Sequence, residues 1–112
     1  MKEITIDENM KGVLVYAKPK SGTYPKNEWL VLIHHVEKAS YDGHLRLIRT
    51  ISYDLSNQEE YFSYYGTGNW GSIKNYNFYY PTEEQKNIIR RILVKNRCKF
   101  IKPFNKLKVY YK

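Results

Sequence analysis

Three histidines are the residues best suited to hold a metal ion or to transfer a proton. His34 and His35 are adjacent in an apolar segment that is typical of a strand, so we expect their side chains on opposite faces, where they cannot chelate one ion. His44 lies further along the chain, but two imidazoles without a third ligand make a weak metal site. We therefore expect structural or solvent-facing histidines, with no metal ion and no organic cofactor.

The carboxylates and the cysteine form no catalytic pattern. Asp7 with Glu8, and Glu59 with Glu60, are adjacent pairs near predicted turns, and the sequence places no cation or histidine beside them. Cys98 is the single cysteine, so no internal disulfide can form, and after an amphipathic helix we expect it to be a small buried side chain. The sequence therefore predicts a protein that is not an enzyme.

The glycine-rich segment at residues 66–71 has the letters of a dinucleotide-binding fingerprint, Gly-Thr-Gly-Asn-Trp-Gly. That fingerprint requires a helix to begin at its glycines, so that backbone amides and the helix dipole meet a pyrophosphate. Residues 72–80 are polar and aromatic and precede a proline, so no helix is expected there. We interpret the segment as a loop that exposes Trp70 as a contact residue.

The net charge of +8 is concentrated at one end of the chain. Residues 1–81 contain nine Lys or Arg and nine Asp or Glu, whereas residues 82–112 contain ten and two. Such a local excess attracts polyanions, and basic side chains interleaved with aromatic ones are typical of single-stranded nucleic acid binding. The predicted binding residues are Lys86, Arg90, Arg91, Lys95, Arg97, Lys99, Lys102, Lys106 and Lys108, together with Trp70.

These features favour a non-enzymatic basic binding module that associates with nucleic acid. An acidic protein surface would attract the same cations, so a protein-binding inhibitor or adaptor is the alternative. The N-terminus lacks the apolar core of a signal peptide, and the longest apolar run is strand-sized, so we expect a cytoplasmic protein and no membrane partner. The oligomeric state and the identity of the partner stay open.

Short β-branched and aromatic runs separated by turn residues predict a strand-rich N-terminal part. From residue 44 to residue 53 apolar and polar residues alternate, so we expect Leu45, Leu47, Arg49, Ile51 and Tyr53 to share one face of a strand. This strand is expected to pair with residues 29–36 through the Asp42-Gly43 turn. The other predicted strands contain Ile4 and Ile6, residues 13–16, and residues 61–65 and 76–80, of which the last two are expected to form a hairpin.

One helix is expected from about Thr82 to about Arg97. Thr82 and Gln85 have the spacing of a capping box, and an apolar stripe follows at helical intervals. A C-terminal hairpin is expected to turn at residues 103–105. The predicted fold class is α+β, in one domain over residues 1–112: an antiparallel sheet or small barrel, then the amphipathic helix, then the hairpin. The stripe consists of Ile88, Ile89, Ile92 and Leu93.

A strand-rich module followed by Tyr80-Pro81-Thr82-Glu83-Glu84-Gln85-Lys86 and an amphipathic helix resembles small accessory proteins carried by phages and mobile elements. The resemblance covers roughly residues 29–101. It implies an accessory or host-interaction role inside a bacterial cell, such as inhibition of a host nuclease in the manner of anti-CRISPR proteins. It implies no catalytic residues.

Overall fold

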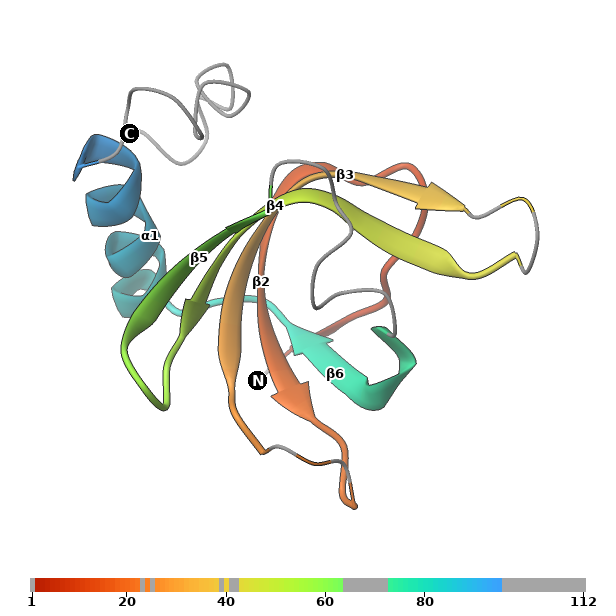
Figure 1. Cartoon of the computed structure of the whole chain (residues 1–112), viewed down its shortest axis with the longest axis horizontal. Coiled ribbons are helices and arrows are strands. Elements are labelled where there is room, and N and C mark those ends of the chain that lie inside the picture. Colours follow the sequence, from red (N-terminus) through yellow and green to blue (C-terminus); the bar gives the residue numbers. More distant parts are fainter. Residues whose placement is uncertain are drawn as a thin grey trace.

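The computed structural model describes residues 2–22, 24, 26–38, 40, 43–63 and 73–95. Within these residues an open, antiparallel sheet of six strands in the order β1-β6-β2-β3-β4-β5 is accompanied by one α-helix (Figure 1). This confirms the α+β class and selects a sheet, because β1 and β5 lie at opposite edges and do not close a barrel. The elements are β1 (Glu3–Ile4), β2 (Lys11–Pro19), β3 (Trp29–Lys38), β4 (Leu45–Asp54), β5 (Glu59–Ser63), the 3₁₀ turn η1 (Ile73–Asn75), β6 (Tyr76–Tyr79) and α1 (Glu83–Lys95).

Strand β3 lies inside the sheet and is buried on both faces. Residues 30–33 have no exposed surface, which explains why this segment is uniformly apolar instead of alternating. On one face, the helix-side core contains Leu30 and Leu32 with the stripe of α1. On the other face, the far-side core contains Val31 and Ile33 with residues of β1, β2 and β6. The sheet therefore separates two apolar layers, and α1 covers only one of them.

A row of three residues across β2, β3 and β4 interrupts the regular pairing. The register with β2 passes from Ile33 opposite Val13 to His35 opposite Lys11, and the register with β4 passes from Ile33 opposite Thr50 to His35 opposite Ile48. His34 lies between these positions. The residues opposite it, Gly12 and Arg49, have φ angles of 63° and 52°, which bend both strands. In Figure 1, β3 and β4 bend together away from α1.

The bend reverses the side-chain alternation predicted for β4. Leu47 packs in the far-side core while Ile51 packs in the helix-side core, although an unbroken strand would place both on one face. The expectation that residues 45, 47, 49, 51 and 53 share a face is therefore wrong. The predicted antiparallel pairing of β3 with β4 is confirmed, from Trp29 opposite Asp54 to Lys38 opposite Leu45.

The predicted hairpin between residues 61–65 and 76–80 is also wrong. Strand β5 pairs with β4 at one edge, whereas β6 lies between β1 and β2 near the other edge. Tyr16 and Ala17 of β2 pair with Tyr79 and Phe78, so the aromatic side chains of β6 meet β2 instead of β5. The aromatic composition of the two segments does not specify which strand each will pair with.

The start of α1 matches the predicted capping box. The Thr82 hydroxyl accepts a hydrogen bond from the Gln85 amide at 3.2 Å, and the Gln85 side chain accepts one from the Thr82 amide at 2.9 Å. Ile89, Ile92 and Leu93 are buried on the sheet as expected, and Ile88 packs against them. Arg97, the predicted helix end, the C-terminal hairpin and the glycine-rich loop lie outside the described residues.

Gly12→Ala tests the bend. A residue with a Cβ at a φ of 63° is strained, so we expect the free energy of unfolding to fall by at least about 1 kcal/mol in urea denaturation. Ser21→Ala, in an exposed turn, is the control and should change it by less than about 0.5 kcal/mol. Equal stability of Gly12→Ala and the wild type would contradict the bent geometry.

Candidate nucleic-acid interface

The outer side of α1 carries basic residues that we call the helix basic surface: Lys86, Arg90, Arg91 and Lys95. They come from the same helix whose Ile89 and Leu93 are fully buried, so the apolar contact with the sheet directs the charges outward. Arg90, Arg91 and Lys95 surround Val94, which is 64% exposed, and together they line a shallow hollow of about 300 Å³. Three cationic side chains around one apolar side chain form a compact contact surface.

Glu83 at the start of α1 neutralises part of this surface. Its carboxylate accepts a hydrogen bond from Arg90 at 2.9 Å and lies 3.6 Å from the Lys86 ammonium group. The hydrogen bond from Arg90 and the charge of Lys86 hold the pKa of Glu83 below its ordinary value. Arg90 also donates to the side chain of Asn87 at 2.7 Å. Arg90 is therefore held along the helix instead of extending into solvent.

The two cations near the end of α1 differ in their surroundings. Lys95 lies 3.4 Å from the Glu60 carboxylate, an ion pair that links the helix to the edge strand β5. Arg91 is exposed, and within the described part of the chain it has no ion pair. An exposed pair such as Lys95 with Glu60 is weak in water, so a phosphate can compete for the lysine. Arg91 and Lys95 are the residues of this surface most available to a partner.

The structure brings together four of the ten predicted binding residues. The other six, which are Arg97, Lys99, Lys102, Lys106, Lys108 and Trp70, lie outside the described residues. On α1, Arg91 and Lys95 are exposed, and Lys86 and Arg90 are half-buried. The sequence did not indicate that Glu83 and Glu60 engage three of them.

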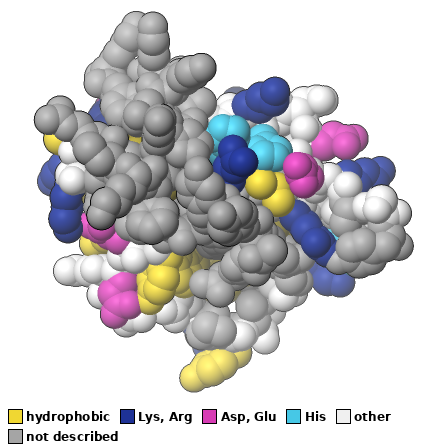
Figure 2. Space-filling view, turned by 45° about the horizontal axis from the view of Figure 1, so that its top comes forward, with side chains coloured by type: hydrophobic (Ala, Val, Ile, Leu, Met, Phe, Trp, Pro, Cys, Tyr) yellow, Lys and Arg dark blue, Asp and Glu magenta, His cyan; other side chains and the backbone are white. Residues whose placement is uncertain are grey.

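The histidine prediction needs a correction. His34 and His35 do not point apart: their Nδ1 atoms are 2.8 Å from each other, because His34 lies in the row where the strands bend. His35 also contacts Glu37 through its Nε2 atom at 3.0 Å. Burial, and then the positive charge of His35, Arg49 and Lys11, lower the pKa of His34. Figure 2 shows the histidines beside basic and acidic side chains on one face of the molecule.

Within the described residues, His34 and His35 are not joined by the further ligands that a metal site requires. Among the described residues, no group of three or more His, Cys, Asp or Glu side chains is placed to hold a metal ion. Two imidazoles in mutual contact, one of them held by a carboxylate, form a local hydrogen-bonded cluster.

No helix in the described part of the chain is long and apolar enough to cross a membrane.

Tyr16 is a buried tyrosine that no sequence pattern singled out. The hydroxyl of Tyr16 on β2 donates a hydrogen bond to the carboxylate of Glu28, which precedes β3. Burial raises the pKa of Tyr16, and the hydrogen bond to Glu28 and its charge raise it further. The Tyr16 ring packs against the Tyr79 ring at a centroid distance of 6.0 Å. This contact ties β2, β3 and β6 together and keeps the phenol protonated.

Asp54 at the end of β4 is buried, with 2% of its surface exposed, and was also missed. Burial opposes its ionisation, but hydrogen bonds from the Asn27 side chain and from the amides of Asn57 and Ser56 outweigh burial and lower its pKa. The Asn57 side chain adds a further bond at 3.0 Å. A carboxylate satisfied by so many donors is a structural anchor for the turn between β4 and β5.

No protein-family model, curated protein or solved structure matches this chain.

Asp54→Ala tests the anchor. It removes a carboxylate that accepts four hydrogen bonds from part-buried donors, so we expect the free energy of unfolding to fall by about 2–3 kcal/mol. Because folding depresses this pKa, the stabilisation is present above the ordinary carboxyl value of 3.8 and is lost as the pH falls through the lower folded value. Urea denaturation of wild type and variant across this acidic range checks both points. A constant difference in stability down to the lowest pH would contradict the role of the ionised carboxylate.

Proposed function

We propose that this chain is a non-enzymatic module that binds nucleic acid through the helix basic surface. The observation that supports this best is the grouping of Arg90, Arg91 and Lys95 around exposed Val94 on the outer side of a helix anchored by its buried face. A surface of this kind holds cations at fixed positions along a phosphate backbone. Basic side chains on one helix are positioned for phosphates and supply affinity without reading sequence.

The chain has further positive charge immediately after α1. Residues 96–112 contain six Lys or Arg and no Asp or Glu, interleaved with Phe and Tyr. These residues follow the helix directly in the sequence, so the positive charge of the chain is concentrated in this part of it. Aromatic rings beside cations suit single-stranded nucleic acid, in which unpaired bases are open to stacking.

The ion pairs of the helix moderate the expected affinity. A phosphate that binds Arg90 or Lys95 must compete with Glu83 or Glu60, which already hold these side chains at 2.9 Å and 3.4 Å. Binding driven by so few available cations is expected to be modest and steeply dependent on salt. Such binding would not discriminate between nucleic acid sequences, because phosphate contacts do not depend on the base.

A second candidate is a phage-type accessory protein that inhibits or adapts a host protein such as a nuclease. Exposed Val94 favours it, because an apolar side chain at the centre of a charged patch contributes little to phosphate binding but supplies buried area to a protein contact. An acidic protein surface would then replace the phosphates. Electrostatic attraction would mainly raise the association rate in that case.

Arg91→Gln combined with Lys95→Gln tests the helix basic surface. We expect binding of arbitrary-sequence single-stranded DNA or RNA to weaken about tenfold at low salt, because two phosphate contacts are lost. The slope of log affinity against log salt should fall by about one to two units. Fluorescence anisotropy across a salt series measures both quantities, and glutamine keeps the helix stable to within about 0.5 kcal/mol per site.

The matched control is Lys18→Gln combined with Lys26→Gln, which removes the same charge from exposed positions on β2 and in the segment before β3. Its affinity should stay close to that of the wild type, whereas Glu60→Gln, which releases Lys95, should bind more tightly. Equal losses in the two double variants would show that the charge acts as a diffuse field. Absence of nucleic acid binding at low salt would reject this proposal in favour of the protein-binding candidate.

A further inference from the structure

Beyond the bend, β3 and β4 continue as a two-stranded ribbon that we call the outer arm: residues 36–38 of β3 and residues 45–47 of β4. These residues pair with each other in the antiparallel register of the two strands. The pairing of β3 with β2 ends at His35 opposite Lys11, so within the described residues the outer arm has no third strand. Figure 1 shows the outer arm projecting from the rest of the sheet. A two-stranded ribbon is marginally stable by itself, so the arm depends on its attachment to the sheet.

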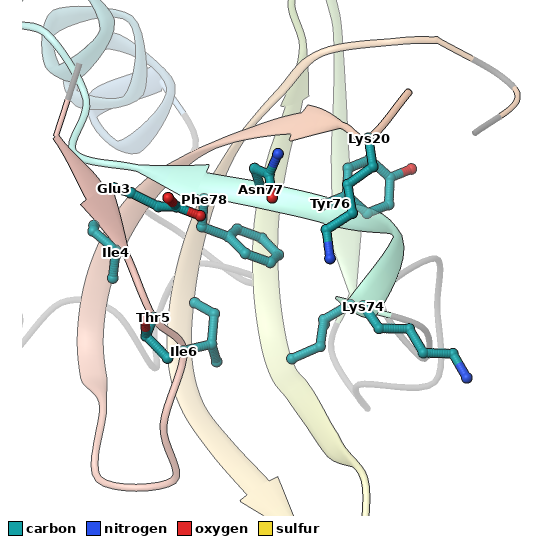
Figure 3. A pocket seen from close by; sticks show the side chains of 10 residues that line it. Glu3, Ile4, Thr5, Ile6, Lys20, Lys74, Tyr76, Asn77 and Phe78 are labelled. Carbon is teal, nitrogen blue, oxygen red and sulfur yellow. The ribbon is translucent and has the colours of Figure 1, made fainter. Parts of the chain in front are cut away.

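The outer arm is attached through the far-side core. Val36 and Leu47, which are 5% and 1% exposed, pack in this core. Elsewhere the core is covered incompletely, because a hollow of about 280 Å³ between β1, η1 and β6 reaches its residues Ile4, Ile6 and Phe78 (Figure 3). The helix α1 packs on the other core. The arm is therefore an important part of the cover of this face, and the bend directs its apolar side chains inward.

His34 and His35, which we call the histidine pair, lie where the outer arm begins. Their Nδ1 atoms are 2.8 Å apart, so one of these atoms donates a proton and the other accepts it. The Nε2 atom of His35 donates to the Glu37 carboxylate at 3.0 Å, because a carboxylate only accepts. The contact between the two Nδ1 atoms can form with no added proton or with one. It cannot form with two, because both Nδ1 atoms then carry hydrogen.

The strands beside the histidine pair carry three cations and one carboxylate among the described residues. Lys11 of β2 is opposite His35, and Arg46 of β4 is opposite Glu37. Arg49 of β4 is in the row of the bend. The surroundings of the pair are therefore mainly positive, and they disfavour a second added proton.

The pKa of His34 agrees with this arrangement. Burial, and then the positive charge of His35, Arg49 and Lys11, lower it from the ordinary histidine value of 6.5. Because the pKa is lower in the folded chain, the unfolded or opened segment binds this proton more readily. The stabilisation by the pair is present above a pH of 6.5 and is lost as the pH falls through the lower folded value.

We propose that the histidine pair is an acid-sensitive switch that releases the outer arm from the far-side core when both imidazoles are protonated. The second proton breaks the contact between the Nδ1 atoms and places two positive charges side by side, next to Lys11 and Arg49. The bend then relaxes, and Val36 and Leu47 leave the core together because they are paired on one ribbon. This inference goes beyond the proposed function and does not depend on it, since no residue of the switch belongs to the helix basic surface.

Amide hydrogen exchange of the full chain, followed by NMR between about pH 7.5 and about pH 5, tests the proposal. The measured quantity is the protection factor of the outer arm divided by that of residues 30–33, so that global unfolding and the intrinsic pH dependence of exchange cancel. We expect this ratio to fall severalfold as the ring signals of His34 report its protonation. A constant ratio while the His34 ring binds its proton overturns the proposal, whether or not any variant folds.

His34→Gln and His35→Gln each leave an amide that donates and accepts hydrogen bonds but binds no proton in this range. The fall should be absent in His34→Gln and smaller than in the wild type in His35→Gln. The matched control is His44→Gln, which removes the exposed third histidine just before β4 and should keep the full fall. A full fall in His34→Gln, or its loss in His44→Gln, overturns the proposal.

Discussion

Burial of β3 on both of its faces is the constraint on which the rest of this structure depends. Residues 30–33 are completely inaccessible, so the chain must cover them from two sides. The helix α1 covers one side with Ile89, Ile92 and Leu93. Residues of β1, β2 and β6, and the bent ends of β3 and β4, cover the other. Loss of either layer would expose a continuous apolar surface to water.

Because the strands bend at Gly12, His34 and Arg49, residues of the sheet itself form much of the far-side core. Reversing the alternation turns Val36 and Leu47 into the far-side core, which α1 cannot reach. The left-handed backbone conformation of Arg49 is unfavourable by itself, and the packing of the far-side core stabilises it. The same bend brings His34 and His35 into contact, so this histidine geometry follows from the packing of the core.

The helix basic surface and the hollow beside β1 both follow from this two-layered arrangement. Because α1 gives its apolar stripe to one layer, its basic residues face outward, where Glu83 and Glu60 reduce the charge they offer. Because β1 is too short to pair along all of β6, the other layer is left with a hollow beside Lys20 and Lys74. Composition alone overstates the positive charge that the helix basic surface offers, because part of this charge is already paired. Composition gives no indication of the hollow.

The sequence by itself determined the local elements: the capping box at Thr82, the apolar stripe of α1 and the runs that form β2, β3 and β4. These depend on neighbouring residues, on helical or alternating spacing, and on turn residues. Only the tertiary structure decided that β6 pairs with β2 instead of β5, that the strands bend at His34, and that Asp54 is a buried anchor. Each of these depends on contacts between residues far apart in the chain, and neither spacing nor composition encodes which distant partner buries the most apolar surface.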